Sequence, residues 1–192
     1  MEALTPCLQH FIQMLVQHKV LQLHQLDAVH KVLAESFSEE MEQFGSAKDV
    51  CHACNTALQR AGLEIRGCQY AGAEYYALTP ANAADSLAVQ HASGFDQWQI
   101  DVVNKMLDEF AAQEENPDAH SDPRRMRQEK IKNLRPQGKT GEMMDVLLQK
   151  LLDDKWLVQT QNKGFVCLGP RTYVELQEQL RDRNMETSPL VV

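Results

Sequence analysis

Cys51 and Cys54 are separated by two residues in the segment Cys51-His52-Ala53-Cys54, a spacing that can place two thiolates on one zinc ion. A tetrahedral structural zinc site needs four ligands, and the next cysteine, Cys68, has no second cysteine near it. A redox pair of this spacing belongs after a strand, at the start of a helix, in a βαβ context that this sequence lacks. Because the pair lies inside a helical pattern, we interpret it as core filling and expect no metal site.

The sequence contains none of the common catalytic patterns. It has no GxGxxG or Walker phosphate-binding loop and no GxSxG nucleophile elbow. The seven histidines share no motif with a nucleophile; they are His10, His18, His24, His30, His52, His91 and His120. We therefore expect no catalytic residue, no cofactor and no small-molecule substrate.

A basic segment is the main candidate for nucleic-acid contact. From Pro123 to Lys139 the chain carries seven basic residues and the single acid Glu129, a local charge of +6 that leaves −14 for the rest. This separation of charge lets one basic face contact DNA phosphates. The alternative is that the basic face is solvated or meets an acidic partner. No aromatic residue lies among these charges, so double-stranded DNA is favoured over a single strand. The candidate DNA contacts are Arg124, Arg125, Arg127, Lys130 and Lys132.

Composition limits the class of protein. The chain has 192 residues, a formal net charge of −8 and 43% hydrophobic residues, enough for one large or two small cores. Its apolar runs are far shorter than the roughly 20 residues that cross a bilayer, and no secretory signal begins the chain. Five cysteines, an odd number, form no disulfide framework. We expect a globular protein of a reducing compartment with no membrane partner.

The N-terminal half is predicted to form three helices and a hairpin. The helices run from Pro6 to His18, from about Gln25 to Ser36 and from a Ser46 cap to Ala61, after a short extended piece at 20–23. Strands 63–66 and 75–78 follow, around a turn region from Gly67 to Gly72. The apolar residues of the first helix cover about twice the arc that a surface helix usually buries. It is either central to its own domain or docks on a partner, with Leu8, Phe11, Met14 and Leu15 as candidate contacts.

The C-terminal half repeats this order. A helix begins near Phe95, residues 113–122 are predicted to be an exposed loop, and 123–134 is a weakly patterned element. Thr140 is the predicted N-cap of a helix whose apolar stripe is Met143, Val146, Leu147, Leu151 and Leu152. A hairpin over 155–168 and one closing helix from Pro170, with Tyr173, Leu176 and Leu180 on one face, complete the unit.

Three helices followed by a hairpin are typical of a winged helix. We therefore predict an α+β fold, mainly α with short β-hairpins, built as tandem winged-helix domains. The first domain spans residues 1–80 and a linker 81–94. The second spans 95–184, and 185–192 forms a tail.

The C-terminal half resembles a known family. The string LLQKLLDDKWLVQTQNKGFVCLGPRTYVELQEQL, residues 147–180, is similar to the second winged helix of the non-SMC element one subunit of the Smc five-six chromosome complex. The segments LEIRG and YYALT fit the same family in the N-terminal half. In that family two winged helices precede a zinc-binding RING-like domain, and the full protein is an E3 ubiquitin ligase.

The resemblance implies a nuclear subunit of a DNA-repair complex that binds a MAGE-family winged-helix partner and a kleisin subunit. No cysteine follows Cys167, so the tail is expected to lead to a RING-like domain absent from this sequence. Zinc is implied only for that domain, and this chain is expected to be a non-catalytic module. The alternative is a winged-helix transcription regulator. The helix from Glu142 to Asp154 disfavours it, because four acids and only Lys150 lie on it.

Overall fold

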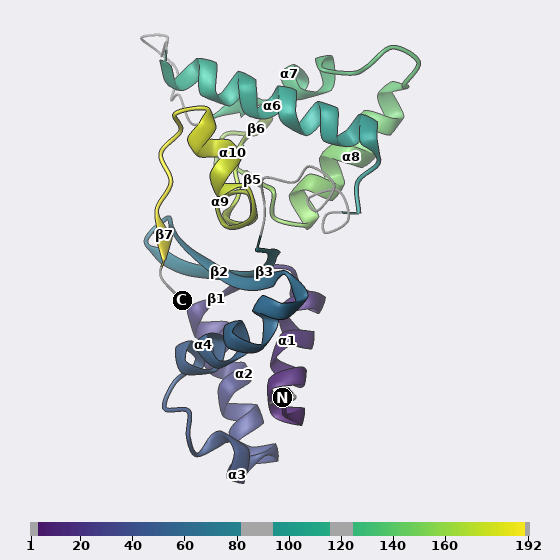
Figure 1. The fold of residues 1–192 in the computed structure, drawn as a ribbon. Coiled ribbons are helices and arrows are strands. Elements are labelled where there is room, and N and C mark those ends of the chain that lie inside the picture. Colours follow the sequence, from purple (N-terminus) through teal and green to yellow (C-terminus); the bar gives the residue numbers. More distant parts are fainter. Residues whose placement is uncertain (1–3, 82–93, 116–124, 191–192) are drawn as a thin grey trace.

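The computed structural model describes residues 4–81, 94–115 and 125–190 (Figure 1). The N-terminal unit contains α1 (Pro6–His18), β1 (Leu21–Gln22), α2 (Leu23–Ser36), α3 (Ser38–Met41), α4 (Ala47–Leu58), the 3-10 turn η1 (Gln59–Ala61), β2 (Leu63–Tyr70) and β3 (Ala73–Pro80). β3 lies between β1 and β2 and pairs antiparallel with both. The helices pack on one face of this sheet (Figure 1).

The C-terminal unit has the same order. It contains α6 (Gln97–Glu115), β4 (Met126–Arg127), α7 (Gln128–Asn133), α8 (Gly141–Asp153), β5 (Leu157–Gln159) and β6 (Phe165–Leu168), followed by α9 (Pro170–Glu175), α10 (Gln177–Asp182) and β7 (Pro189–Leu190). β6 lies between β4 and β5, so the strand that precedes the hairpin again pairs with its second strand. The predicted α+β class is confirmed, and the order helix, strand, helices, hairpin in both units agrees with a winged helix.

Two helix starts form as their caps predict. The Ser46 hydroxyl accepts a hydrogen bond from the Asp49 amide at 3.3 Å and starts α4, and the Thr140 hydroxyl accepts one from the Met143 amide at 3.3 Å and starts α8. Each bond satisfies one of the amides that a helix start leaves without an intrahelical partner. Gly62 ends η1 in the left-handed conformation, as its place after the third predicted helix suggests.

The first hairpin is longer than predicted. β2 and β3 pair over eight residues each, so the expected turn from Gly67 to Gly72 is wrong, and the chain reverses at Ala71 and Gly72 alone. Both have positive φ, 49° and 81°, as a two-residue type I′ hairpin turn requires. Gly67 instead lies within β2, opposite Tyr76. Glycine suits this position because a Cβ there would lie only 3.0 Å from the Tyr76 ring.

The buried face of α8 differs from the predicted stripe. Met144, Leu147, Leu148 and Leu151 are buried, whereas Val146 is 68% exposed. Met143 and Leu152 are half-buried at the edges of the face. The helix is apolar around most of its circumference, so its sequence admits several stripes, and packing against α6 and the hairpin selects one of them.

Three further boundaries differ from the sequence prediction. The closing helix is two short helices, α9 and α10, with a break at Leu176, whose φ of −110° and ψ of 26° leave the helical range. The weak element at 123–134 contains both β4 and α7. Residues 113–115 extend α6, and the rest of the predicted loop lies outside the described residues.

Each unit has its own hydrophobic core. Phe11, Leu15, Leu26 and Val50 belong to the first core, and Phe110, Leu147 and Trp156 to the second. The linker 81–94 lies almost wholly outside the described residues, so the predicted domain boundaries stay predictions. The described helices include none that is long and apolar enough for a membrane span.

Candidate functional site at the junction of the two units

Helix α9 forms the centre of the junction. It belongs to the C-terminal unit and lies over the face of the β2–β3 sheet opposite α1, α2 and α4 (Figure 1). Gly169 precedes it at a point where the Lys155 carbonyl passes so closely that any Cβ would overlap its oxygen and lie 2.9 Å from its carbon. Pro170 then occupies the first helical position, where its missing N–H costs no hydrogen bond.

A buried ion pair occupies the inner side of α9. Arg171 is 2% exposed and its Nε donates to Glu175 Oε1 at 2.5 Å. Its guanidinium lies 4.4 Å from the Trp156 ring centre, and its Nη1 is 3.5 Å from Asp154 Oδ2. Burial raises the pKa of the Glu175 carboxyl, and the attraction of Arg171 opposes that shift without cancelling it. Burial therefore disfavours the ionised carboxylate of Glu175, and the attraction of Arg171 reduces this free-energy cost.

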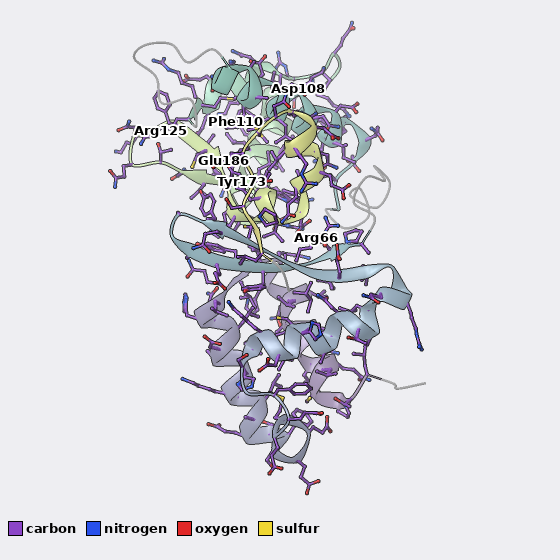
Figure 2. All side chains as sticks on the ribbon, turned by 60° about the vertical axis from the view of Figure 1, so that its left-hand side comes forward. Arg66, Asp108, Phe110, Arg125, Tyr173 and Glu186 are labelled. Carbon is purple, nitrogen blue, oxygen red and sulfur yellow. The ribbon has the colours of Figure 1, made fainter. Side chains whose placement is uncertain are left out.

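Apolar side chains seal the contact between α9 and the sheet. Val174 is fully buried against Val20, Cys68 and Ala77 of the first unit. Tyr173 lies in this region, between the second unit and the sheet (Figure 2). Its ring centre is 5.5 Å from that of Tyr70, which comes from β2. These contacts bury apolar surface from both units, which stabilises their relative placement.

Hydrogen bonds cross the same junction. The Tyr70 hydroxyl donates to the Leu168 carbonyl at 3.0 Å, and Gln177 Nε2 donates to the Gly67 carbonyl at 3.2 Å. Arg66, labelled on the sheet in Figure 2, lies 4.0 Å from Glu178 of α10. Burial is the main reason why the pKa of Tyr70 is raised. Polar side chains of the junction thus bind two backbone carbonyls and one opposite charge across the two units.

The tail returns to the first unit. β7 pairs antiparallel with β2, with Leu190 opposite Gly67 and Pro189 opposite Cys68, and the Gln69 amide donates to the Ser188 carbonyl at 2.9 Å. Where the sequence suggests a tail that leads away, the described residues form a fourth strand of the first sheet. The segment before β7 borders a cavity of about 450 Å³, whose other walls include Tyr70, Phe110 and Tyr173.

Sequence reasoning missed the polar residues of this junction. Arg171, Glu175 and Gln177 are all less than 9% exposed, although residues of these types are usually on the surface. The available signal was an arginine and a glutamate four residues apart on a short helix whose other residues are mostly apolar. The GPR and EL segments of the family resemblance contain this pair.

The candidate DNA contacts do not form one free basic patch. Arg124 lies outside the described residues. Lys130 Nζ is 2.7 Å from Glu109, and Lys132 Nζ is 2.6 Å from Asp145, so both are paired within their own unit. Arg125 and Arg127 are exposed at β4, and the Arg127 guanidinium lies 5.4 Å from the Phe165 ring of the neighbouring strand. A DNA role for these residues stays a prediction, with Arg125 and Arg127 in the most accessible place.

The candidate partner contacts on α1 lie mostly inside the first unit. Leu8 is 8% exposed, and Phe11 and Leu15 are fully buried in the core. Met14 is half-buried, and Val16, outside the predicted set, is 51% exposed. The wide apolar arc of α1 is therefore used by α2, α4 and the sheet. Leu8, Phe11 and Leu15 are core residues that a partner cannot reach in this conformation.

Cys51 and Cys54 fill the core as predicted. Both are fully buried, and burial raises the pKa of each thiol to about 12. Cys68 is also fully buried, with its pKa raised to about 12 for the same reason. Within the described residues no three metal-ligating side chains gather, so the structure places no further ligands beside Cys51 and Cys54 as a structural zinc site would need.

We expect a maleimide to modify Cys167 alone in the folded chain near pH 8. Cys167 is half-exposed, whereas Cys7, Cys51, Cys54 and Cys68 are buried. A thiol with a pKa near 12 is ionised in about one molecule in ten thousand at pH 8, and the thiolate is the reactive form. Intact-mass spectrometry should show one adduct in buffer and five in 8 M urea. Rapid modification of Cys51 or Cys54 in buffer would contradict their placement in the core.

Comparisons with known proteins agree with this architecture. The family model "Nse1 non-SMC component of SMC5-6 complex" matches residues 8–176. A chain of a solved "Nse1-Nse3-Nse4 complex" is similar in fold, with a TM-score of 0.73 and 20% sequence identity over 96% of this chain and 77% of that chain. A search of curated protein sequences gives no match. Because the family model covers both units, the chain belongs to the Nse1 family of non-SMC components of the SMC5-6 complex.

Proposed function

We propose that this chain is an assembly subunit of the SMC5-6 complex that binds Nse3, the MAGE-family subunit, and Nse4, the kleisin subunit. One observation carries the proposal: 96% of the chain shares its fold with a chain of an Nse1-Nse3-Nse4 complex. Membership of the Nse1 family over residues 8–176 supports the same role. In this proposal the chain acts in the nucleus, on chromosomes and in DNA repair.

We infer that its contribution is binding rather than chemistry. The buried polar groups of the junction are engaged in contacts within the second unit, as Arg171 and Glu175 show, and between the units, as Gln177 and Gly67 show. Three of the thiols are buried with raised pKa values, which suits packing and not nucleophilic catalysis. The ubiquitin-ligase activity that the resemblance implies for the full family requires a zinc-held surface, and the described cysteines do not supply one.

Reconstitution tests the proposed assembly. The chain is co-expressed with its cognate Nse3 and Nse4 and separated by size exclusion with light scattering. The expected result is one stable peak that contains all three proteins in equal amounts. A chain that elutes alone as a monodisperse monomer, while Nse3 and Nse4 elute together, would reject the proposal.

Contact with double-stranded DNA is a second proposed function, which the exposure of Arg125 and Arg127 favours. These residues border the hairpin of the second unit, and Lys163 lies at its turn. Winged helices use this edge to reach phosphates. The outward face of α8 offers no such chemistry because Glu142, Asp145 and Asp153 are exposed on it. The structure therefore supports backbone contact by the hairpin edge over a transcription regulator that reads the major groove with α8.

Reversing Arg125 and Arg127 to glutamate is expected to weaken duplex binding by about tenfold or more and to reduce the slope of log affinity against log salt by about two. The physical reason is that two phosphate contacts are lost, so the variant releases fewer counterions from the DNA when it binds. The matched control reverses Lys130 and Lys132, which carry the same charge but lie on α7 and not on the strand edge beside the hairpin. Fluorescence anisotropy at several salt concentrations measures both. Equal affinities for wild type and the Arg125/Arg127 variant would reject the DNA role of this edge.

A further inference from the structure

A strap connects the two units beside the cavity of about 450 Å³. It consists of residues 185–190, the segment that follows α10 and ends with β7 in Figure 1. Asn184 ends α10 with a φ of 56°, and the Met185 amide donates to the Leu180 carbonyl at 3.0 Å, as in a Schellman motif. Met185 lies in the second core, and Leu190 packs against the first core. The strap is therefore anchored at one end in each unit.

The strap binds the first unit through few contacts. β7 has two residues, Pro189 and Leu190, and pairs with β2. Pro189 has no N–H group, so it donates no backbone hydrogen bond to β2. The Gln69 amide adds a bond of 2.9 Å to the Ser188 carbonyl. A segment held by so few contacts opens at a low free-energy cost.

Ser188 precedes a proline, and a serine or threonine in this position is the substrate of proline-directed protein kinases. The sequence contains two other such residues, Thr5 and Thr79. Thr79 is 1% exposed, and Thr5 is followed by the helix α1, which begins at Pro6. Kinases bind the residues around the modified hydroxyl in an extended conformation, which a following proline favours. Of the three residues, Ser188 is the one that is exposed and leads directly into a strand.

The side chain of Ser188 lies on the face of the strap that borders the cavity. Ser188 and Glu186 both line the cavity, and the lining does not include Thr187 between them. This is the alternation expected of an extended chain. Other walls are formed by the aromatic rings of Tyr70, Phe110 and Tyr173, the last two of which are labelled in Figure 2. Among the described residues that line the cavity, Glu186 carries the only charge.

We propose that Ser188 is a phosphorylation site of a proline-directed kinase and that its phosphate releases the strap from β2. The Ser188 Oγ forms a bond to the γ-phosphorus of ATP, and the bond between that phosphorus and the oxygen that bridges to the β-phosphate breaks. ADP leaves with the bridging oxygen, and the hydroxyl proton passes to a carboxylate of the kinase. The phosphoserine carries a charge of about −1.5 to −2 at pH 7.

The closed strap is an unfavourable place for this phosphate. Glu186 lies two residues away on the same face, so its carboxylate repels the new charge. The π-faces of the neighbouring rings are also negative, and the described residues of the lining include no lysine or arginine. When the strap opens, water hydrates the phosphate instead. The two residues of β7 make too few contacts to offset this gain.

Release of the strap loosens the junction without separating the units. The contact of α9 with β2 and β3 does not include the strap, so Val174 is expected to stay buried against Cys68 and Ala77. Met185 keeps the strap attached to the second core. Phosphorylation of Ser188 thus regulates how rigidly the two units are joined.

The first measurement locates the phosphate. The full chain is incubated with magnesium ATP and two proline-directed kinases in separate reactions, one mitogen-activated and one cyclin-dependent, and tandem mass spectrometry identifies the modified residue. We expect phosphate on Ser188 and none on Thr79. Pro189→Ala is the matched control, since it keeps the serine and removes the proline, and it is expected to lose the modification. Absence of phosphate from Ser188 with both kinases, or equal modification of the Pro189→Ala chain, would overturn the inference.

The second measurement follows release of the strap by amide hydrogen exchange in NMR spectra. The Gln69 amide, which donates to the Ser188 carbonyl, is expected to exchange about tenfold or more faster in the phosphorylated chain. The Gly169 amide is the internal control, because its bond to the Trp156 carbonyl lies within the second unit, and its rate is expected to stay the same. An unchanged or slower rate at Gln69 would show that the phosphate does not release the strap and would overturn the inference.

A charge variant tests the cause of release. Glu186→Lys changes an exposed residue and places an ammonium group on the same face as Ser188. The phosphorylated and unmodified forms of this variant are compared with each other. The ammonium group can pair with the phosphate, so the acceleration at Gln69 is expected to be smaller than in the wild type. An equally large acceleration would reject repulsion by Glu186 as the cause of release.

Discussion

Replacing Arg171 by methionine is expected to lower the free energy of unfolding by about 3–5 kcal/mol. Arg171 is the only cation within hydrogen-bond distance of Glu175 in the described structure, at 2.5 Å, and Glu175 is only 6% exposed. Without Arg171 the fold must either bury an uncompensated carboxylate or bind a proton there. Urea unfolding followed by tryptophan fluorescence measures the change, since Trp156 lies directly against the substituted side chain.

The double variant Arg171→Met/Glu175→Leu separates the charge from the packing. Replacement of both partners of a buried ion pair by apolar residues of similar size is often neutral or stabilising. We expect the double variant to recover most of the loss and to unfold within about 1–2 kcal/mol of the wild type. A double variant as unstable as the single one would show that the contact of Arg171 with Trp156, and not the charge pair, is responsible.

The loss should also depend on pH in a defined direction. Burial raises the pKa of Glu175 in the fold, so the folded state binds a proton there more tightly than the unfolded state does. The contribution of this carboxyl group to the free energy of unfolding is therefore fully present below its unfolded pKa and is lost as pH rises through the folded value. Removal of Arg171 raises that pKa further, because the attraction that opposed the shift is gone. The difference between wild type and Arg171→Met is therefore expected to be smaller at pH 5 than at pH 7. A difference that grows at pH 5 would contradict the raised pKa.

The junction gives these stability effects a functional meaning. Each unit has its own core, and the docking of α9 on β2 and β3 and the pairing of β7 with β2 join the two units into one surface. A subunit that holds partners together gains from such a fixed surface, because no free energy is spent on ordering the two units when a partner binds. Variants of Arg171 should consequently weaken partner binding as well as the fold.

Local signals in the sequence predicted the elements well. The caps at Ser46 and Thr140 depend on one side chain and one nearby amide, and both form. The hairpin over Leu157–Leu168 needs only β-forming residues and a turn glycine, Gly164, whose φ is 81°. These features are readable because the interacting groups are close in the chain.

Features set by tertiary packing were predicted less well. The face of α8 could not be chosen from its sequence because both Val146 and Leu148 fit an apolar stripe, and only the assembly of the second core buries Leu148. The wide apolar arc of α1 suggested spare surface at Phe11 and Leu15, whereas the first core covers both. The predicted partner contacts do not include Val16, which lies beside them and is exposed. Burial at such positions depends on residues far away in the chain, which periodicity does not report.

The junction was beyond sequence reasoning for the same reason. Arg171 and Glu175 look like a solvated pair on a helix until the β2–β3 sheet is placed over them. The return of Pro189–Leu190 to β2 left no local signal, since two residues of strand pairing set no pattern. The family resemblance nevertheless marked the relevant segment, because Gly169, Pro170 and Arg171 lie within the string that carries it.

Replacing Gly169 by alanine is expected to cost about 3 kcal/mol of the free energy of unfolding. The backbone at Gly169 is extended, with φ of −91°, so alanine meets no torsional penalty there. The cost comes from space: the new Cβ would overlap the Lys155 carbonyl and lie 3.1 Å from the Trp156 carbonyl carbon, both backbone atoms that cannot rotate away. The chain must shift, and the Gly169 amide would lose its 2.7 Å hydrogen bond to the Trp156 carbonyl.

Gly141→Ala is the matched control for this steric argument. A Cβ at Gly141 would meet only the end of the Arg135 side chain, at 3.7 Å, an ordinary contact. Gly141 is the first residue of α8, where alanine favours the helix over glycine by up to about 1 kcal/mol. Urea unfolding of both variants should show a large loss for Gly169→Ala and no loss for Gly141→Ala. If Gly169→Ala unfolds at the wild-type midpoint, the close approach of α9 to the hairpin, which positions Arg171 in the junction, is not a tight constraint.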